Sequence, residues 1–420
     1  MGIPGCDDVV LIEQSKNSDN PTVVTVNCPD KAGLGSDLCR IILEFGLSIT
    51  RADFSTDGRW CYMVFWVVPH SALHNPNWNS LKNRLSYASP PCLGPFYFDQ
   101  KFSVTSVPSL YLLKFCFVDR KGLLHDVAKV LTELEFSIQR VKVMTTPDGK
   151  VLDLFFITDE LDLLHTEKRQ SDTCRHLATV FKEYCISCEL QLAGPEYESL
   201  QSLSSLPQPI AEELFSCEQL EEKTVNQSLG AGKVAEKAIV TVDNQMSPAH
   251  TLLQIKCIDQ KGLFYDILRT SKDCNIRVTY GRFSSSVKGY RSMDLFIQQI
   301  DGNKILDPKM QLALCSRLKT EMLHPFRVIV ANRGPDTELL LANPVELSGK
   351  GRPRVFYDVT LALKTLGICI FSAEIARHAT QDQQWEVYRF LLNENCEIPL
   401  ACAQARKRIV DRVRRTLMGW

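Results

Sequence analysis

The sequence lacks a charge excess, because 48 Lys and Arg residues stand against 49 Asp and Glu residues in a chain of 420. A net charge of −1 gives no overall field that would attract nucleic acid or an anionic membrane. No run approaches the roughly 20 apolar residues of a membrane-spanning helix, and the N-terminus lacks the basic start and apolar core of a secretion signal. We therefore expect a cytoplasmic protein that binds neither nucleic acid nor membrane.

The nucleus remains an alternative location because residues 406–415 form a basic run. Ile409, Val413 and Leu417 place an apolar helical face through that run, which favours a packing helix with a solvated basic face.

The arrangements typical of enzymes and metal proteins are also missing. The 16 cysteines are expected to be reduced and to act as small apolar residues, since no secretion signal is present. Cys185 and Cys188 have CxxC spacing, but no second pair or nearby histidine completes a tetrahedral site. His125 adjoins Asp126 without a nucleophile and a converging base. We expect no enzymatic activity, no metal and no cofactor.

The sequence does contain one motif three times, Asp-x-x-Gly-Leu-x-x-Asp. Its copies are Asp30, Gly33, Leu34 and Asp37; Asp119, Gly122, Leu123 and Asp126; and Asp259, Gly262, Leu263 and Asp266. Each copy follows a run of alternating apolar residues and precedes an apolar stripe of helical spacing. When the polar stretch between the second and third copies is left out, the copies repeat about every 90 residues, which indicates a repeated module.

Each module has the predicted element order βαββαβ. A hairpin turn is marked by Asp57-Gly58, Asp148-Gly149 or Lys288-Gly289, where glycine supplies a positive φ. This order predicts an α+β fold of ferredoxin-like modules, each an antiparallel sheet with both helices on one face, paired side by side. The expected final strands are residues 98–107, 186–192 and 326–331.

A fourth module is degenerate. Aligning Asp358 with the second motif aspartate matches the following helix, but Arg354 then occupies the glycine position and Gly351 the first aspartate position. This module lacks a final strand of its own, and residues 8–12 are our candidate to cover its edge. We expect the linker to divide the modules into two pairs, with the fourth packed against the third.

The predicted boundaries are a tail (1–20), two modules (21–108 and 109–195), a polar linker (196–246) and two further modules (247–335 and 336–420).

The glycine loop has two chemical interpretations. The first amides of the following helix have no intrahelical partner and lie at the positive end of its dipole, so they can bind a carboxylate. The motif aspartate can accept hydrogen bonds from an ammonium group, so the loop suits a free amino acid. Alternatively, the aspartate caps the turn and the glycine only permits it.

The Asp-x-x-Gly-Leu loop after strand one of a βαββαβ unit resembles the ACT domain. Four such units, with the segments VVTVNCPDKAGLGSDLCRIILEFGLSI and STDGRWCYMVFWVV, resemble the plant ACT domain repeat proteins. They are also similar to the modules that end the bacterial uridylyltransferase, which senses glutamine.

The resemblance implies side-by-side pairing, effector binding at the module interface and a role as an amino-acid sensor, with glutamine as one candidate ligand. The implied contacts are Asp30, Gly33, Leu34, Asp119, Gly122, Leu123, Asp259, Gly262 and Leu263. The competing hypothesis is a scaffold that binds a partner enzyme, or a further copy of the chain, without a ligand. RNA binding ranks last, because the third strands carry Asp153 or Asp294 in place of a basic aromatic signature.

Overall fold

The computed structural model describes residues 9–15, 20–71, 75–91, 109–194, 206–216, 238–284, 287, 289–380, 383–393, 400 and 402–419. These residues form four modules, which belong to two compact units. Unit 1 contains modules 1 and 3, and unit 2 contains modules 2 and 4.

The elements of unit 1 alternate strand pairs with helices. Module 1 consists of β1 (Val10–Glu13), β2 (Thr22–Pro29), α1 (Leu34–Glu44), β3 (Leu47–Thr56), β4 (Trp60–Pro69) and α2 (Trp78–Ala88). Module 3 consists of β9 (Ala238–Asp243), β10 (Thr251–Ile258), α7 (Leu263–Asp273), β11 (Ile276–Phe283), β12 (Tyr290–Gln299) and α8 (Pro308–Leu323).

Unit 2 is built in the same way, with one module in the expected order. Module 2 consists of β5 (Tyr111–Val118), α3 (Leu123–Glu133), β6 (Phe136–Thr145), β7 (Lys150–Asp159), α4 (Glu167–Phe181), the 3-10 helix η2 (Lys182–Tyr184) and β8 (Cys185–Leu192). Module 4 consists of β13 (Arg327–Arg333), β14 (Asp336–Pro344), α9 (Val355–Thr365), β15 (Ile370–Ala379), β16 (Gln384–Leu392) and α10 (Ala403–Met418).

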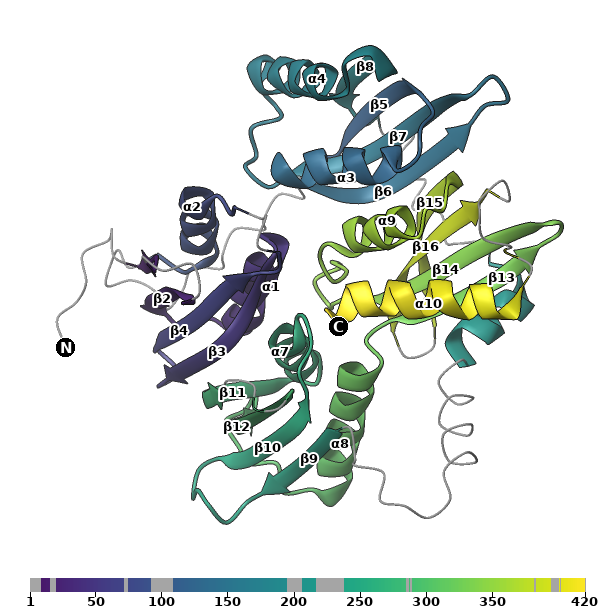
Figure 1. The fold of residues 1–420 in the computed structure, drawn as a ribbon. Coiled ribbons are helices and arrows are strands. Elements are labelled where there is room, and N and C mark those ends of the chain that lie inside the picture. The colour runs from purple at the N-terminus through teal and green to yellow at the C-terminus, as the bar shows by residue number, and fades with distance from the viewer. Residues whose placement is uncertain are drawn as a thin grey trace. The chain divides into compact units, whose positions relative to one another are not determined.

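Each unit contains one continuous antiparallel sheet of eight strands (Figure 1). The strand order is β1-β2-β4-β3-β11-β12-β10-β9 in unit 1 and β13-β14-β16-β15-β6-β7-β5-β8 in unit 2. The helices bury the apolar stripes read from the sequence: Leu38 and Ile42 of α1, and Val127 and Leu131 of α3, are each 0% exposed. The predicted α+β fold of paired ferredoxin-like modules is confirmed.

The modules of unit 1 join where β3 pairs antiparallel with β11. A Cβ at Gly281 would overlap the ring of Phe54, so a residue without a side chain is needed at this close approach. Arg282 Nε lies 3.2 Å from Asp53 Oδ1 across the same seam. The apolar residues of both modules form one buried cluster, so the seam is part of the core of unit 1.

The structure corrects the predicted pairing. Module 4 pairs with module 2 through β15 and β6, and module 3 pairs with module 1 through β11 and β3. The expectation that module 4 packs against module 3 was therefore wrong. The free edges of these strands all offer the same backbone groups, so a strand pattern identifies an edge without specifying its partner.

The outer edge strands also differ from the prediction. Residues 326–331, expected to end module 3, lie within or beside β13, which pairs with β14 and covers the edge of module 4. Our candidate for that edge was residues 8–12, of which 10–12 lie instead in β1, which pairs with β2 of module 1. Residues 238–243, assigned to the linker, form β9 and pair with β10. The expected strand at 98–107 lies outside the described residues.

Three modules therefore take their edge strand from the segment before strand one. A hairpin reaches that edge over a short connection, as the two residues Gly334 and Pro335 do between β13 and β14. Gly334 has a φ of +63°. This Gly-Pro pair between two apolar runs was the sequence signal for a hairpin, and we had placed a module boundary beside it.

Part of the linker packs on module 4. Residues 208–216 form a short helix, and Leu214 is 0% exposed. Leu214 belongs to one buried apolar cluster with Leu340 and Ala342 of β14. These residues alternate with Leu339 and Leu341, so the linker helix covers one sheet face while α9 covers the other.

The basic C-terminal segment is a packing helix, as expected. Ile409, Val413 and Leu417 of α10 are buried, at no more than 1% exposure. Over the described ranges, no helix is both long enough and apolar enough to cross a membrane.

Candidate functional site

The strand-to-helix loops of the four modules have one backbone shape. We call them loop 1 (residues 30–34), loop 2 (119–123), loop 3 (259–263) and loop 4 (351–355). The residue before each helix is left-handed, with φ of +79° at Gly33, +77° at Gly122, +71° at Gly262 and +64° at Arg354. Glycine adopts this conformation readily, whereas Arg354 adopts it at a cost of about 1–2 kcal/mol.

Loop 1 is filled by side chains of module 3. The Asp30 carboxylate accepts hydrogen bonds from Thr56 Oγ1 at 2.7 Å and from Arg277 Nη2 at 2.7 Å. Its side chain is only 7% exposed. Lys272 Nζ lies 3.0 Å from Asp37 Oδ1, and the Lys272 side chain occupies the space beside Gly33 where a Cβ would project. The motif aspartate of loop 1 is therefore neutralised within the protein.

Loop 3 is neutralised by its own module. Arg291 of β12 holds the Asp259 carboxylate with two hydrogen bonds, of 2.7 Å from Nε and 2.9 Å from Nη2. The same guanidinium donates from Nη1 to the carbonyl oxygens of Ser284 and Thr50 and lies over the ring of Phe283. Two parallel hydrogen bonds to a carboxylate are the strongest geometry available to arginine.

In loop 4 the acid comes from a neighbouring strand and not from the loop itself. A Cβ at Gly351, the aspartate position, would collide with the carboxylate of Glu386 from β16. Glu386 accepts hydrogen bonds from Asn343 Nδ2 at 3.0 Å and from Tyr388 Oη at 2.9 Å, and it pairs with Arg377 at 2.9 Å. Loop 4 therefore also contains an acid matched by a guanidinium.

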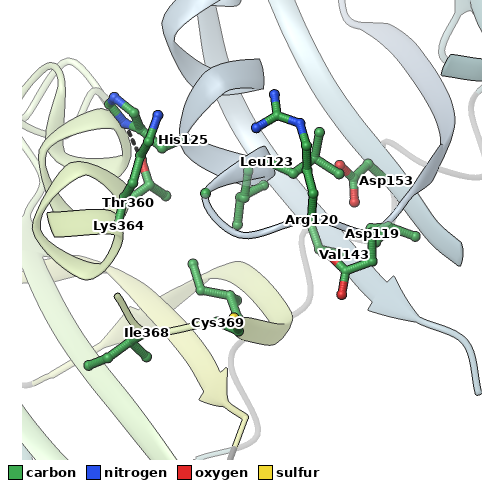
Figure 2. Close-up of a pocket in the computed structure, with 14 residues that line it drawn as sticks. Asp119, Arg120, Leu123, His125, Val143, Asp153, Thr360, Lys364, Ile368 and Cys369 are labelled. Atoms are coloured by element: carbon green, nitrogen blue, oxygen red, sulfur yellow. Dashed lines mark hydrogen bonds between the residues drawn. The ribbon is translucent and has the colours of Figure 1, made fainter. Parts of the chain in front are cut away.

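Loop 2 opens onto a cavity between modules 2 and 4. The cavity is partly open, and its volume is about 440 Å³ when the adjoining open solvent is counted. Its walls include loop 2, the start of α3 and the end of α9 with the residues that follow it. Figure 2 shows Asp119, Arg120 and Asp153 on the module 2 side, with Lys364 and Cys369 contributed by module 4.

Two carboxyl groups line this cavity without a cationic partner. Asp153 of β7 is 0% exposed, and neither of its oxygens has a hydrogen-bond partner. Burial and the nearby Asp119 raise the pKa of Asp153 to about 8. Burial also raises the pKa of Asp119, and among the described residues this carboxylate forms no ion pair. An unpartnered buried carboxyl such as that of Asp153 is costly, and such groups often occur at functional sites.

The basic groups of the cavity are already engaged. Asp126 lies 2.6 Å from Arg120 Nη2 and 2.6 Å from Lys364 Nζ. His125 Nδ1 lies 3.3 Å from Thr360 Oγ1, as the dashed line in Figure 2 marks. Burial, followed by the nearby Lys364, lowers the pKa of His125, which favours its neutral form at pH 7. None of these groups neutralises Asp153 or Asp119.

Family models match the chain along its length. They are described as ACR10, N-terminal (residues 12–90), ACT domain (111–175), ACR9-like, ACT-like domain (239–336) and ACR9, C-terminal (337–419). The "ACT domain-containing protein ACR9" of Arabidopsis thaliana is 68% identical over 100% of both chains. The chain belongs to the ACR family of ACT domain-containing proteins.

Other relatives of this ACR-family chain are less similar to it in sequence. The "ACT domain-containing protein ACR10" of Arabidopsis thaliana is 49% identical over 100% of both chains. The "Bifunctional uridylyltransferase/uridylyl-removing enzyme" of Gluconobacter oxydans is 24% identical over 45% of this chain and 17% of its own length. The predicted resemblance to ACT repeat proteins, and the more distant one to uridylyltransferase, are confirmed.

The predicted contact residues lie in two kinds of surroundings. Asp119, Gly122 and Leu123 line the cavity, together with Asp153. The loop 1 set of Asp30, Gly33 and Leu34, and the loop 3 set of Asp259, Gly262 and Leu263, lie where an internal arginine holds the aspartate. Over the described ranges, no group of three or more His, Cys, Asp or Glu side chains is arranged to hold a metal ion.

The sequence reasoning missed Asp153 and Cys369 as site residues. We used Asp153 only as an argument against RNA binding. The available signal was an acid at an inward-facing strand position where modules 1 and 3 have Met63 and Met293. Cys369 gave no signal, because its importance depends on module 4 being the partner of module 2.

Proposed function

We propose that this protein is a non-enzymatic regulatory protein that binds a free amino acid in the cavity of unit 2 and acts as an amino-acid sensor. The observation that carries the proposal is the cavity at loop 2, with the buried, unpartnered Asp153 in its wall. Loops 1 and 3 keep the motif as a turn whose acid is neutralised internally.

The cavity offers both charges that a zwitterion requires. Helix α3 begins at Leu123 inside the cavity wall, and its first amides have no intrahelical acceptor, so they suit a carboxylate. Asp119 and Asp153 supply acceptors for an ammonium group. The cavity also lies at a module seam, so a ligand that prefers one arrangement of modules 2 and 4 would shift their association.

The test is a thermal-unfolding screen of the full chain against the twenty amino acids. A ligand at 100 times its Kd stabilises unit 2 by about 2.7 kcal/mol, which is a shift of several degrees in the midpoint. Gly122→Val should remove the shift, because a side chain there is strained at φ +77° and would meet the Lys364 side chain.

The matched control is Gly33→Val, which places the same strain in loop 1 at φ +79°. This variant should be less stable but should keep the ligand-induced shift. A flat response to all twenty amino acids would refute the proposal, and so would equal loss of the shift in both variants.

A ligand-independent scaffold is the second candidate. It is favoured by a row of apolar side chains on the helix-free face of module 2, where Met144 is 43% and Leu152 38% exposed. The pairing of Cys116 with Leu152 and of Leu152 with Met144 places these three residues side by side across the sheet. A partner protein that binds this face equally well with and without amino acids would favour the scaffold.

A further inference from the structure

We infer that the cavity of unit 2 selects a small molecule with a cationic group, namely a basic amino acid whose guanidinium or ammonium lies between Asp119 and Asp153. The inference rests on the proposed amino-acid site and specifies the chemistry of its ligand.

The other loops of the same chain show what an acid at this position binds. Asp30 is held by Arg277, Asp259 by Arg291, and Glu386, which fills the equivalent space in loop 4, by Arg377. In each case the partner is a guanidinium within 2.9 Å of a carboxylate oxygen. Asp119 in loop 2 has no such partner among the described residues.

In the described part of the chain, the absence of a guanidinium beside Asp119 follows from the residue at one position of module 4. In unit 1, Arg277 immediately precedes Val278, where the bulge of β11 begins, and it reaches across the seam to Asp30. In unit 2, the residue before the corresponding bulge at Ile370 is Cys369, which lines the cavity. A short thiol side chain therefore stands where unit 1 has a long cationic one, and this difference leaves room for a ligand.

A second exchange adds a carboxyl group to the same space. Met63 in module 1 and Met293 in module 3 pair with the strand residues Phe54 and Phe283, and Asp153 pairs with Val143 at the equivalent position of module 2. Beside loop 1, unit 1 thus has the acid Asp30 together with the guanidinium of Arg277 and the thioether of Met63. Beside loop 2, unit 2 has the two acids Asp119 and Asp153 together with the thiol of Cys369.

A hydroxyl group beside the loop has also lost its partner. Thr56 Oγ1 donates to Asp30 in module 1, whereas the equivalent Thr145 Oγ1 in module 2 is buried without a hydrogen-bond partner. Thr56 pairs with Cys61, and Thr145 with Val151, at the same strand register. Thr145 Oγ1 in unit 2 therefore lacks the hydrogen bond to the motif aspartate that Thr56 forms in unit 1.

The other charged groups facing Asp153 and Asp119 leave this excess of acid in place. Arg120 and Lys364 both pair with Asp126, and burial favours neutral His125. An ammonium or guanidinium entering the cavity would supply donors to the buried Asp153 oxygens, which now have none, and a cationic partner to the exposed Asp119. Such charge-assisted hydrogen bonds are about twice as strong as neutral ones.

The test is isothermal titration calorimetry of the full chain with L-arginine, L-lysine, L-glutamine and L-leucine. We expect arginine or lysine to bind at least tenfold more tightly than glutamine or leucine. Asp153→Asn should reduce this preference to less than threefold. Cys369→Arg should abolish binding, because it restores the internal guanidinium of unit 1.

Cys402→Arg is the matched control, since it adds the same side chain at an exposed cysteine outside the cavity, and it should bind like the wild type. Circular dichroism establishes that each variant is folded, and Cys369→Arg keeps the inference testable if Asp153→Asn does not fold. Equal binding of neutral and basic amino acids would overturn the inference and leave the proposed site standing. A cationic preference that survives both variants would also overturn it, and absence of binding by every amino acid would refute the proposed function itself.

Discussion

Loops 1 and 2 share their motif residues and their left-handed glycine, but different side chains meet their aspartates. Arg277 and Thr56 hold Asp30, and Met63 fills the adjacent inward position. Asp119 faces a cavity, with Cys369 and the buried Asp153 in its wall. The two loops show that the motif provides only the turn. Residues on other strands, one of them from another module, decide whether the turn also has room for a ligand.

Exchanging the inward residues of modules 1 and 2 should have the largest effect. Met63→Asp places an unpartnered carboxyl in the core of unit 1 and should cost about 3–5 kcal/mol. Asp153→Met removes such a group and should stabilise unit 2 by about 1–3 kcal/mol. Hydrogen exchange measured on peptides from each unit is the suitable measurement, because unfolding of a two-unit chain is not expected to be two-state.

In that experiment the peptides of the unmutated unit are the internal control. Destabilisation of unit 2 by Asp153→Met would contradict the assignment of Asp153 as an unpartnered buried acid, since removing it would then break interactions.

Asp153 should also make the stability of unit 2 depend on pH. Its pKa is about 8 in the folded chain and near 4 when unfolded, so the folded state holds a proton that the unfolded state releases. The stability that this proton provides is fully present below pH 4 and is lost as the pH rises through 8.

Asp153→Asn should remove this dependence, so the stability of the wild type should fall relative to the variant between pH 4 and pH 8. Chemical denaturation at several pH values checks the difference curve, in which Asp119 and His125 are common to both proteins. A difference curve that is flat or rises over this range would show that Asp153 is ionised in the folded chain.

Removing the arginine of loop 1 should have the smallest of the three effects. Arg277→Cys leaves Asp30 with Thr56 but without its cation, and should destabilise unit 1 by about 1–3 kcal/mol. The Arg277 side chain is 37% exposed, so solvent screening places the expected loss toward the lower end of that range.

The same variant sharpens the comparison of the loops, because it copies the Cys369 arrangement into unit 1. Free L-arginine at millimolar concentration should restore part of the lost stability, whereas L-glutamine should not. Equal protection by both amino acids would show that the guanidinium is not what the site recognises.

Much of the fold could be predicted from local patterns. Alternating apolar residues, helical stripes and turn glycines identified most strands and helices, because each pattern reflects the periodicity of one element. The degenerate loop 4 was also found, and its helix α9 begins after Arg354 as aligned. The edge strands were misassigned because a segment before strand one and a segment after helix two can cover the same edge.

The sequence by itself determined the repeated module, the shape of the glycine loop and the residues that form it, since these depend on interactions within a few tens of residues. Only the tertiary structure decided that module 2 pairs with module 4, and therefore that Cys369 faces Asp119. The edges of β6 and β15 offer the same backbone hydrogen-bonding groups as other strand edges, so only their side chains can favour this particular pairing. The site is created by that pairing, so its ligand chemistry depends on residues about 250 positions apart in the chain.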